Sequence, residues 1–215
     1  MTVYRTFFAA VTGLLLGLSL ALSPAAASEQ DPKAFVTNLA SSAMETMTTK
    51  GLSDQERSAK FRTLFTSDVD VNEIAKFVLG YHWRPPTTAE QQQEFLRLFE
   101  DIVVMTWSTR FKDYGGDLRH TVTDVNQDGE RGITVDSKVD REKQNPIALQ
   151  WRLKRSENGL RVVDLIVEGA SMRITYRSEY ASVIQANGGK IEGLLVAMRN
   201  MRTKLQANDV ASKTN

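Results

Sequence analysis

Two kinds of residue in this sequence could support nucleophilic catalysis, a serine after a glycine turn and two histidines. Ser171 ends the run Glu168-Gly169-Ala170-Ser171, but a nucleophilic serine needs a base, and neither His82 nor His120 is near it in sequence. A serine in this position more often caps a helix, and isolated histidines more often have structural or surface positions. We therefore predict no serine-based catalytic site.

The carboxylates of the second half could act in pairs or bind a metal. Asp164 and Glu168 would lie on one face of a strand, about 13 Å apart, which is too far for glycoside hydrolysis. The segment 124–129 has the spacing of the start of a calcium-binding loop, but its twelfth position is Val135 instead of a bidentate glutamate. The phosphate-binding loop, H-E-x-x-H and G-x-S-x-G motifs are missing from the sequence. We predict no catalytic residue, metal site or cofactor.

The N-terminus has the pattern of a cleaved signal peptide. Arg5 precedes an apolar run from Phe7 to Leu22, Pro24 follows, and Ala25-Ala26-Ala27 provides the small residues of a cleavage site. The apolar run is shorter than the roughly 20 residues that a membrane-spanning helix needs. We expect cleavage before Ser28 and a periplasmic location, with an uncleaved membrane anchor as the alternative.

Cysteine content and charge exclude several classes of protein. The sequence has no cysteine, which excludes disulfides, thiolate metal sites and the lipidated cysteine of a bacterial lipoprotein. The net charge is +1, and removal of Arg5 would leave 26 basic and 26 acidic side chains. This balance does not suggest a broad surface for nucleic acid.

Apolar residues spaced three to four apart predict helices in the first half of the mature chain and at its end. Capping boxes at Ser53/Glu56 and at Thr88/Gln91 mark two of the helix starts. The expected helices run from Asp31-Pro32 to Gly51, from Ser53 through Phe65, from Val71 to Gly80, from Thr88 to Tyr114-Gly115-Gly116, from Met172 to Ala186 and from Ile191 to Leu205.

Between the helical regions the hydrophobic period changes to two, which predicts strands. The expected strands are Leu118–Val125, Ile133–Val139, Ile147–Lys154 and Leu160–Val167, with turns at Asp128-Gly129, Asn145-Pro146 and Asn158-Gly159. The predicted fold class is α+β: a curved antiparallel β-meander of about four strands with amphipathic helices packed on one face, similar in shape to NTF2 and cystatin-like proteins. We divide the chain into a leader (1–27), a single domain (28–207) and a polar, frayed tail (208–215).

Three segments carry a recognisable family pattern. They are Leu79–Arg84 with the helix start Gln91–Phe99, the helix end Trp107–Tyr114, and Val163–Tyr180. The last segment is the most specific, because an aspartate, a Glu-Gly-x-Ser step and a Tyr-Arg pair occur in the family's order and spacing. Together they resemble the MlaC/toluene-tolerance family of periplasmic phospholipid-binding proteins, over nearly all of the mature chain.

Two positions depart from the family pattern. Trp107 stands where the family usually has tyrosine, and Met172 where it often has an aliphatic residue. Both keep apolar bulk, so a lipid pocket is still expected, but the head group and chain type stay open. A hopanoid-associated branch of the family fits the sequence equally well.

The resemblance implies a non-enzymatic lipid carrier. Such a protein would shuttle phospholipid between an outer-membrane lipoprotein complex and an inner-membrane ABC transporter with an MCE-domain subunit, as a monomer and without binding nucleic acid. The carrier must shield acyl chains from water, and one sixteen-carbon chain represents roughly 10 kcal/mol of apolar exposure. A deep apolar cavity between the sheet and the helices would provide this protection.

The resemblance also implies a set of lipid-pocket residues on the apolar faces. The sheet candidates are Val135, Val139, Leu149, Trp151, Val163, Leu165 and Val167, and the helix candidates are Phe95, Phe99, Val103, Trp107, Tyr176, Tyr180 and Ile184. Alternation alone does not decide which face of the strand from Val162 to Val167 points inward. Arg84 and Arg177 could neutralise a head-group phosphate, or could form structural ion pairs with Asp164 or Glu168.

Two other functions are compatible with the same sequence. A small α+β enzyme acting on an apolar substrate would need a carboxylate or histidine with a shifted pKa inside the cavity. An adaptor that supports a membrane complex would carry no lipid. Mass spectrometry of an organic-solvent extract of the purified protein would distinguish the carrier from the adaptor.

Overall fold

The computed structural model describes residues 30–110, 118–128, 132–142 and 144–211. The leader, the predicted end of the long helix at Tyr114-Gly115-Gly116 and the last four residues of the tail lie outside this part. The Asp128-Gly129 turn is only partly inside it. Within these ranges no helix is both long and apolar enough to cross a membrane.

The described part of the chain contains helices at both ends and strands in the middle. The helices are α1 (Pro32–Thr48), α2 (Asp54–Asp68), α3 (Val71–Leu79), the short 3₁₀ helix η1 (Gly80–Trp83), α4 (Ala89–Arg110), α5 (Met172–Ala186) and α6 (Ile191–Ala211). The strands are β1 (Arg119–Asp128), β2 (Gly132–Arg141), β3 (Gln144–Ser156), β4 (Gly159–Val167) and β5 (Ala170–Ser171).

Side-chain caps fix the helix starts where the sequence predicts them. Ser53 and Glu56 bond each other's backbone amide groups at the start of α2, and Thr88 and Gln91 do the same before α4. The Ser171 hydroxyl accepts from the amide of Ile174 at 3.3 Å and begins α5. Its predicted role as a helix cap is confirmed. These bonds satisfy amide groups that have no partner within the helix.

The strands form one antiparallel sheet in the order β1-β2-β3-β4-β5, with each strand beside its neighbour in sequence. The predicted α+β fold with an antiparallel meander is therefore confirmed, and β5 is a two-residue addition to it. The predicted turn at Asn145-Pro146 is wrong, because both residues lie inside β3 and the chain reverses between Arg141 and Gln144. Proline is tolerated near the start of a strand, where its missing donor need not break the ladder.

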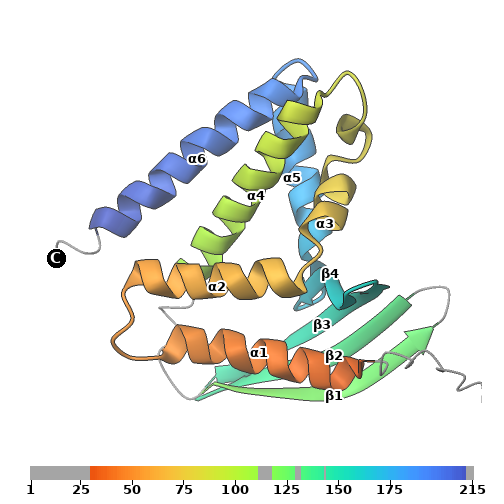
Figure 1. Cartoon of the computed structure of the whole chain (residues 1–215), viewed down its shortest axis with the longest axis vertical. Coiled ribbons are helices and arrows are strands. Elements are labelled where there is room, and N and C mark those ends of the chain that lie inside the picture. Colours follow the sequence, from red (N-terminus) through yellow and green to blue (C-terminus); the bar gives the residue numbers. More distant parts are fainter. Residues whose placement is uncertain (1–29, 111–117, 129–131, 143, 212–215) are drawn as a thin grey trace, which may run out of the picture.

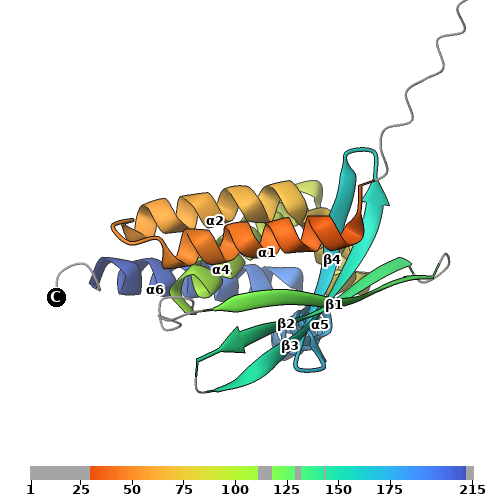
Figure 2. The same cartoon turned by 90° about the horizontal axis from the view of Figure 1, so that it is seen from below.

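The described residues form a two-part molecule (Figure 1). In one part, α3, α4, α5 and α6 pack together, and in the other α1 lies along the sheet. Helix α2 runs beside α1 and links the two parts, and the second view shows α1 and α2 on the same side of the sheet (Figure 2).

Each part has its own hydrophobic core. The helical core includes Phe95, Phe99, Ile184 and Leu195, which are at most 2% exposed. The sheet core packs residues of α1 against β2, β3 and β4. Its buried members are Phe35, Val36, Ile133, Val135, Leu153, Leu160 and Val162.

Candidate functional site

An apolar cavity lies at the junction of the two cores. About 940 Å³ of atom-free space lies within it, a figure that includes solvent at its open mouth. The lining residues come from α1, α2, α3, α4, α5, β3, β4 and the α2–α3 connection. They are Leu39, Ala43, Phe61, Leu64, Phe65, Val69, Ile74, Phe99, Val103, Trp107, Trp151, Val162, Asp164, Leu165, Met172, Arg173 and Tyr176.

Helix α2 covers the cavity with side chains that are not fully packed. Phe61, Leu64 and Phe65 line the cavity and are only half-buried, and the rings of Phe61 and Phe65 stack at a centroid distance of 6.5 Å. Large apolar side chains in a folded interior usually have neighbours on all sides. Those of α2 instead face open space, which a ligand could fill.

The sheet side of the cavity is centred on Trp151 of β3. Its indole nitrogen donates to the Ser137 hydroxyl at 2.9 Å, so its polar atom is satisfied away from the cavity. The ring of His120 meets Trp151 edge-on at 6.2 Å. Burial lowers the pKa of His120, and neither ring nitrogen has a hydrogen-bond partner among the described residues. A neutral His120 therefore supports this wall.

The helical side of the cavity is shared with the helical core. Phe99 and Val103 of α4 are buried in the core and also line the cavity. The ring of Tyr176 packs edge-on against Phe99 at 5.4 Å, and Tyr180 continues this aromatic cluster at 5.9 Å from Tyr176. Burial raises the pKa of Tyr180 well above its ordinary value, and the neighbouring Tyr176 and Glu179 add to the effect.

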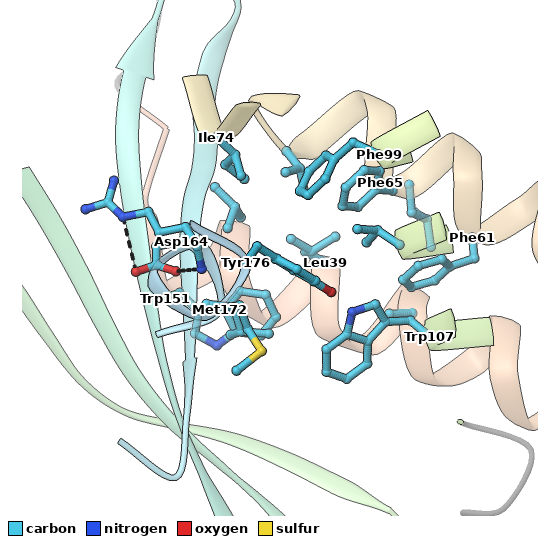
Figure 3. Close-up of a pocket in the computed structure, with 17 residues that line it drawn as sticks. Leu39, Phe61, Phe65, Ile74, Phe99, Trp107, Trp151, Asp164, Met172 and Tyr176 are labelled. Atoms are coloured by element: carbon cyan, nitrogen blue, oxygen red, sulfur yellow. Dashed lines mark hydrogen bonds and ion pairs between the residues drawn. The ribbon is translucent and has the colours of Figure 1, made fainter. Parts of the chain in front are cut away.

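The carboxylate of Asp164 lies at one end of the cavity, with Phe61 and Trp107 toward the other (Figure 3). Its side chain is 0% exposed. It accepts from the Ser171 hydroxyl at 2.7 Å and from the Arg173 amide at 3.2 Å. Arg173 Nε is 3.4 Å from the same carboxylate, and Arg152 Nη1 is 3.9 Å away. The carboxylate thus joins β4 to the start of α5, and its oxygens are already engaged.

Six of the fourteen residues predicted for the pocket lie on the cavity wall. These are Phe99, Val103, Trp107, Trp151, Leu165 and Tyr176. They come from α4, β3, β4 and α5, so the structure brings together side chains far apart in sequence. Their role in binding lipid stays a prediction.

The other eight predicted residues, Val163 among them, lie away from this cavity. The helical core buries Phe95, Tyr180 and Ile184, and the sheet core buries Val135. Leu149 lies on a separate, more polar groove of the sheet that also includes Ile166. Val139 and Val167 are half-buried on strand positions that the cavity does not reach.

Val163 is displaced from the wall by an irregularity in the sheet. Arg152 pairs with Asp164, but Leu153 pairs with Val162, which leaves Val163 as the extra residue of a bulge. A bulge shifts the alternation of side chains beyond it. As a result Val162, one residue earlier than expected, lines the cavity.

Neither arginine predicted to bind a head group lines the cavity. Arg84 is exposed in the connection before α4. Arg177 has a structural role, since Nη1 donates to the carbonyl of Phe77 at 3.1 Å. Its guanidinium also lies 2.9 Å from the position of an ideal Cβ on Gly80, and the φ of +52° at this residue favours glycine. The predicted ion pair of Asp164 is formed by Arg173 and Arg152 instead.

The sequence-based prediction missed the contribution of the first two helices. Leu39 and Ala43 of α1 and Phe61, Leu64 and Phe65 of α2 all line the cavity. Their spacing predicts helices correctly, but apolar spacing does not tell which helix covers an open space. Asp164 was predicted as a possible ion-pair partner of Arg84 or Arg177, whereas its partner Arg173, which lies within the family-like segment, was not predicted.

Comparisons with known proteins agree with the geometry. The chain matches the profile of a family described as MlaC protein over residues 35–200. Its fold is similar to that of a phospholipid-binding protein from Ralstonia solanacearum solved in complex with a phospholipid. The TM-score is 0.72 at 21% sequence identity, over 82% of this chain and 99% of that chain. No curated protein matched the sequence. Because the matched residues make up well over half of the chain, this protein belongs to the MlaC family.

Proposed function

We propose that this protein is a lipid carrier that holds the acyl chains of a phospholipid in the cavity between its two cores. The observation that supports this proposal is the apolar wall of the cavity, which includes Phe61, Phe65, Trp107 and Trp151. Each buried methylene group would contribute about 0.8 kcal/mol to binding. The phospholipid bound to the Ralstonia protein of the same fold supports this ligand class.

We place this carrier in the periplasm, with residues 1–27 as its cleaved leader. It would move lipid between an outer-membrane lipoprotein complex and an inner-membrane MCE-type ABC transporter, whose ATPase would supply the energy. It would catalyse no reaction itself. The engagement of the Asp164 carboxylate by Ser171, Arg173 and Arg152 supports a structural role for the acid on the cavity wall.

A direct test is the lipid content of the purified protein. The full chain is expressed in a Gram-negative host and purified without detergent. An organic-solvent extract is then analysed by mass spectrometry. We expect a phospholipid at a fixed ratio to protein, whereas a hopanoid would assign the chain to the other branch of the family. An extract without lipid, together with no binding to added phospholipid, would favour the adaptor.

A cavity-filling variant tests whether the lipid occupies this cavity. Ala43→Trp on α1 places a large ring in the space and should lower lipid occupancy at least about tenfold, because the ring and the acyl chain compete for one volume. The matched control is Ala59→Trp on the exposed side of α2. Leu64→Trp is a second filling variant. Thermal melts identify which variants are folded. Full occupancy in a folded filling variant would place the lipid elsewhere.

A further inference from the structure

Two arginines, Arg152 and Arg173, lie at the Asp164 end of the cavity, and Arg177 shares the Phe77 ring with Arg173. Arg173 places its guanidinium carbon 4.3 Å from the ring centre of Phe77, and that of Arg177 lies 5.1 Å from the same centre. Arg152 and Arg173 both approach the Asp164 carboxylate. We call Arg152, Arg173 and Arg177 the arginine cluster.

The arginine cluster carries more positive charge than its partners neutralise. Two of its guanidinium groups, those of Arg152 and Arg173, share one carboxylate, that of Asp164, which leaves an excess of one positive charge between them. The nearby pair of Lys154 and Glu73, 3.1 Å apart, is neutral and does not alter this balance. An arginine cannot lose its proton in a protein, so the excess persists at every physiological pH.

Arg173 connects this charge to the apolar cavity. It lines the cavity, while its side chain retains 20% exposure. Its Nε is buried without a hydrogen-bond partner among the described residues, and its contacts with Asp164 and Phe77 are an ion pair and a ring contact. A long arginine stem can cover apolar surface while its charged end remains near water. Because Nε faces Asp164, the donors that Arg173 can offer a ligand where the apolar wall ends are those of its two Nη groups.

We infer that the arginine cluster binds the anionic oxygen group of an amphiphile whose chain lies in the cavity, with Arg173 making the direct contact. This inference rests on the proposed function and adds a preference for net-anionic lipids over neutral lipids with the same chains. The shared chemistry is a phosphate or carboxylate oxygen, which a guanidinium binds through charge-assisted hydrogen bonds. The head group leaves the cavity at the Asp164 end, between β4 and the start of α5.

The test compares lipids that differ only in the head group. Delipidated full-length protein is titrated with dioleoylphosphatidylglycerol and with dioleoylglycerol, which has the same chains and no charge. We expect the wild type to bind the anionic lipid about tenfold or more tightly, as for hydrogen bonds to charged groups. Arg173→Gln should remove most of this preference, because its affinity for the anionic lipid should fall by a much larger factor than its affinity for dioleoylglycerol. Arg173→Lys should retain part of the preference, because the charge remains without the planar fork.

Controls separate this inference from general effects of charge and from the proposed function. Arg97→Gln removes the same charge from an exposed position on α4 and should keep the full preference. Excess inorganic phosphate should not displace the lipid, and displacement would assign the cluster to free anions. Equal binding of the two lipids by the wild type would overturn the inference whether or not the variants fold. An equal loss for both lipids in Arg173→Gln would also overturn it. Failure to bind either lipid would instead reject the proposed function.

Discussion

The helical core and the cavity wall are built from the same kinds of side chain but differ in how they are packed. In the helical core Phe95 is 0% exposed, stacks on Phe99 at 5.8 Å and meets Tyr180 edge-on at 5.9 Å. On the cavity wall Phe61 and Phe65 stack on each other but stay half-buried. Interdigitation on all sides stabilises the first region. The side chains of the cavity wall lack neighbours on one side, and a ligand can occupy the space beside them.

Polar contacts and the half-buried ring of Phe65, which packs against the helical core, hold α2 over the cavity. Arg62 of α2 pairs with Glu100 of α4, and with Asp101 at 2.8 Å. The Ser58 hydroxyl donates to that of Ser108 at 3.0 Å. None of the α2 side chains that the structure describes is fully buried. Elements with few buried apolar contacts open at lower free energy than a packed core, so α2 is the element most suited to admit a ligand.

The largest expected difference between the helical core and the cavity wall is in the stability lost when one phenylalanine ring is removed from each. Phe95→Ala should lower the free energy of unfolding by about 3–5 kcal/mol, because it leaves a cavity in a packed core. Phe61→Ala should cost less than roughly 1.5 kcal/mol in lipid-free protein, since its ring already borders open space and buries less surface. Urea denaturation of both delipidated variants measures the difference. Similar losses would mean that the wall is packed as tightly as the core.

Sequence patterns predicted the elements of this fold because the signals were local. The capping boxes at Ser53 and Thr88, the change of hydrophobic period near Leu118 and the glycines after α5 all act within a few residues. The misplaced turn at Asn145-Pro146 shows the limit of such signals. Proline marked an interruption there, but pairing with β2 at Gln144 and again from Ile147 continued the strand through it. The end of α6 at Ala211 is likewise later than the predicted end at Leu205.

The site was harder to predict than the fold, because a cavity forms where side chains of different elements fail to contact one another. Phe95 and Phe99 are one helical turn apart and equally apolar, yet only Phe99 reaches the cavity. Nothing local in the sequence marks the bulge that moves Val163 off the wall and Val162 onto it. The coverage of the cavity by α2 depends on its polar contacts with α4, which come from residues about forty positions apart.

Smaller changes in stability and in the rate of lipid exchange should follow when the polar contacts of α4 with α2 or with α6 are removed. Arg62→Gln removes the tie to α2 and should cost roughly 1 kcal/mol or less in stability. It should speed exchange of bound lipid several-fold, because α2 opens more often. The matched variant Glu94→Gln cuts the tie from α4 to Arg199 of α6, at 2.6 and 2.9 Å, and should leave exchange unchanged. Transfer of a fluorescent phospholipid to vesicles measures both rates, and equal rates would mean that α2 is not the moving element.

The smallest effects concern the dependence of stability on pH. The cavity wall should lose stability at acid pH and the helical core at alkaline pH. Burial lowers the pKa of His120 beside the wall. The unfolded chain takes up a proton below about pH 6.5 before the folded protein does. Stability should therefore fall as the pH drops below that value, and His120→Phe should remove this part of the loss. Burial raises the pKa of Tyr180 in the core, so stability should fall as the pH rises past about 10, where an unfolded tyrosine ionises.

Tyr180→Phe should remove the loss of stability at alkaline pH without changing the loss at acid pH. His120→Phe should remove the loss at acid pH without changing the loss at alkaline pH. Thermal melts of the two variants and the wild type across the pH range separate these contributions. Bound lipid should protect against the acid loss more than the alkaline one, because His120 packs on the Trp151 ring of the cavity wall whereas Tyr180 lies in the closed core. Equal protection at both ends would show that the lipid couples to the whole fold instead of to its open side.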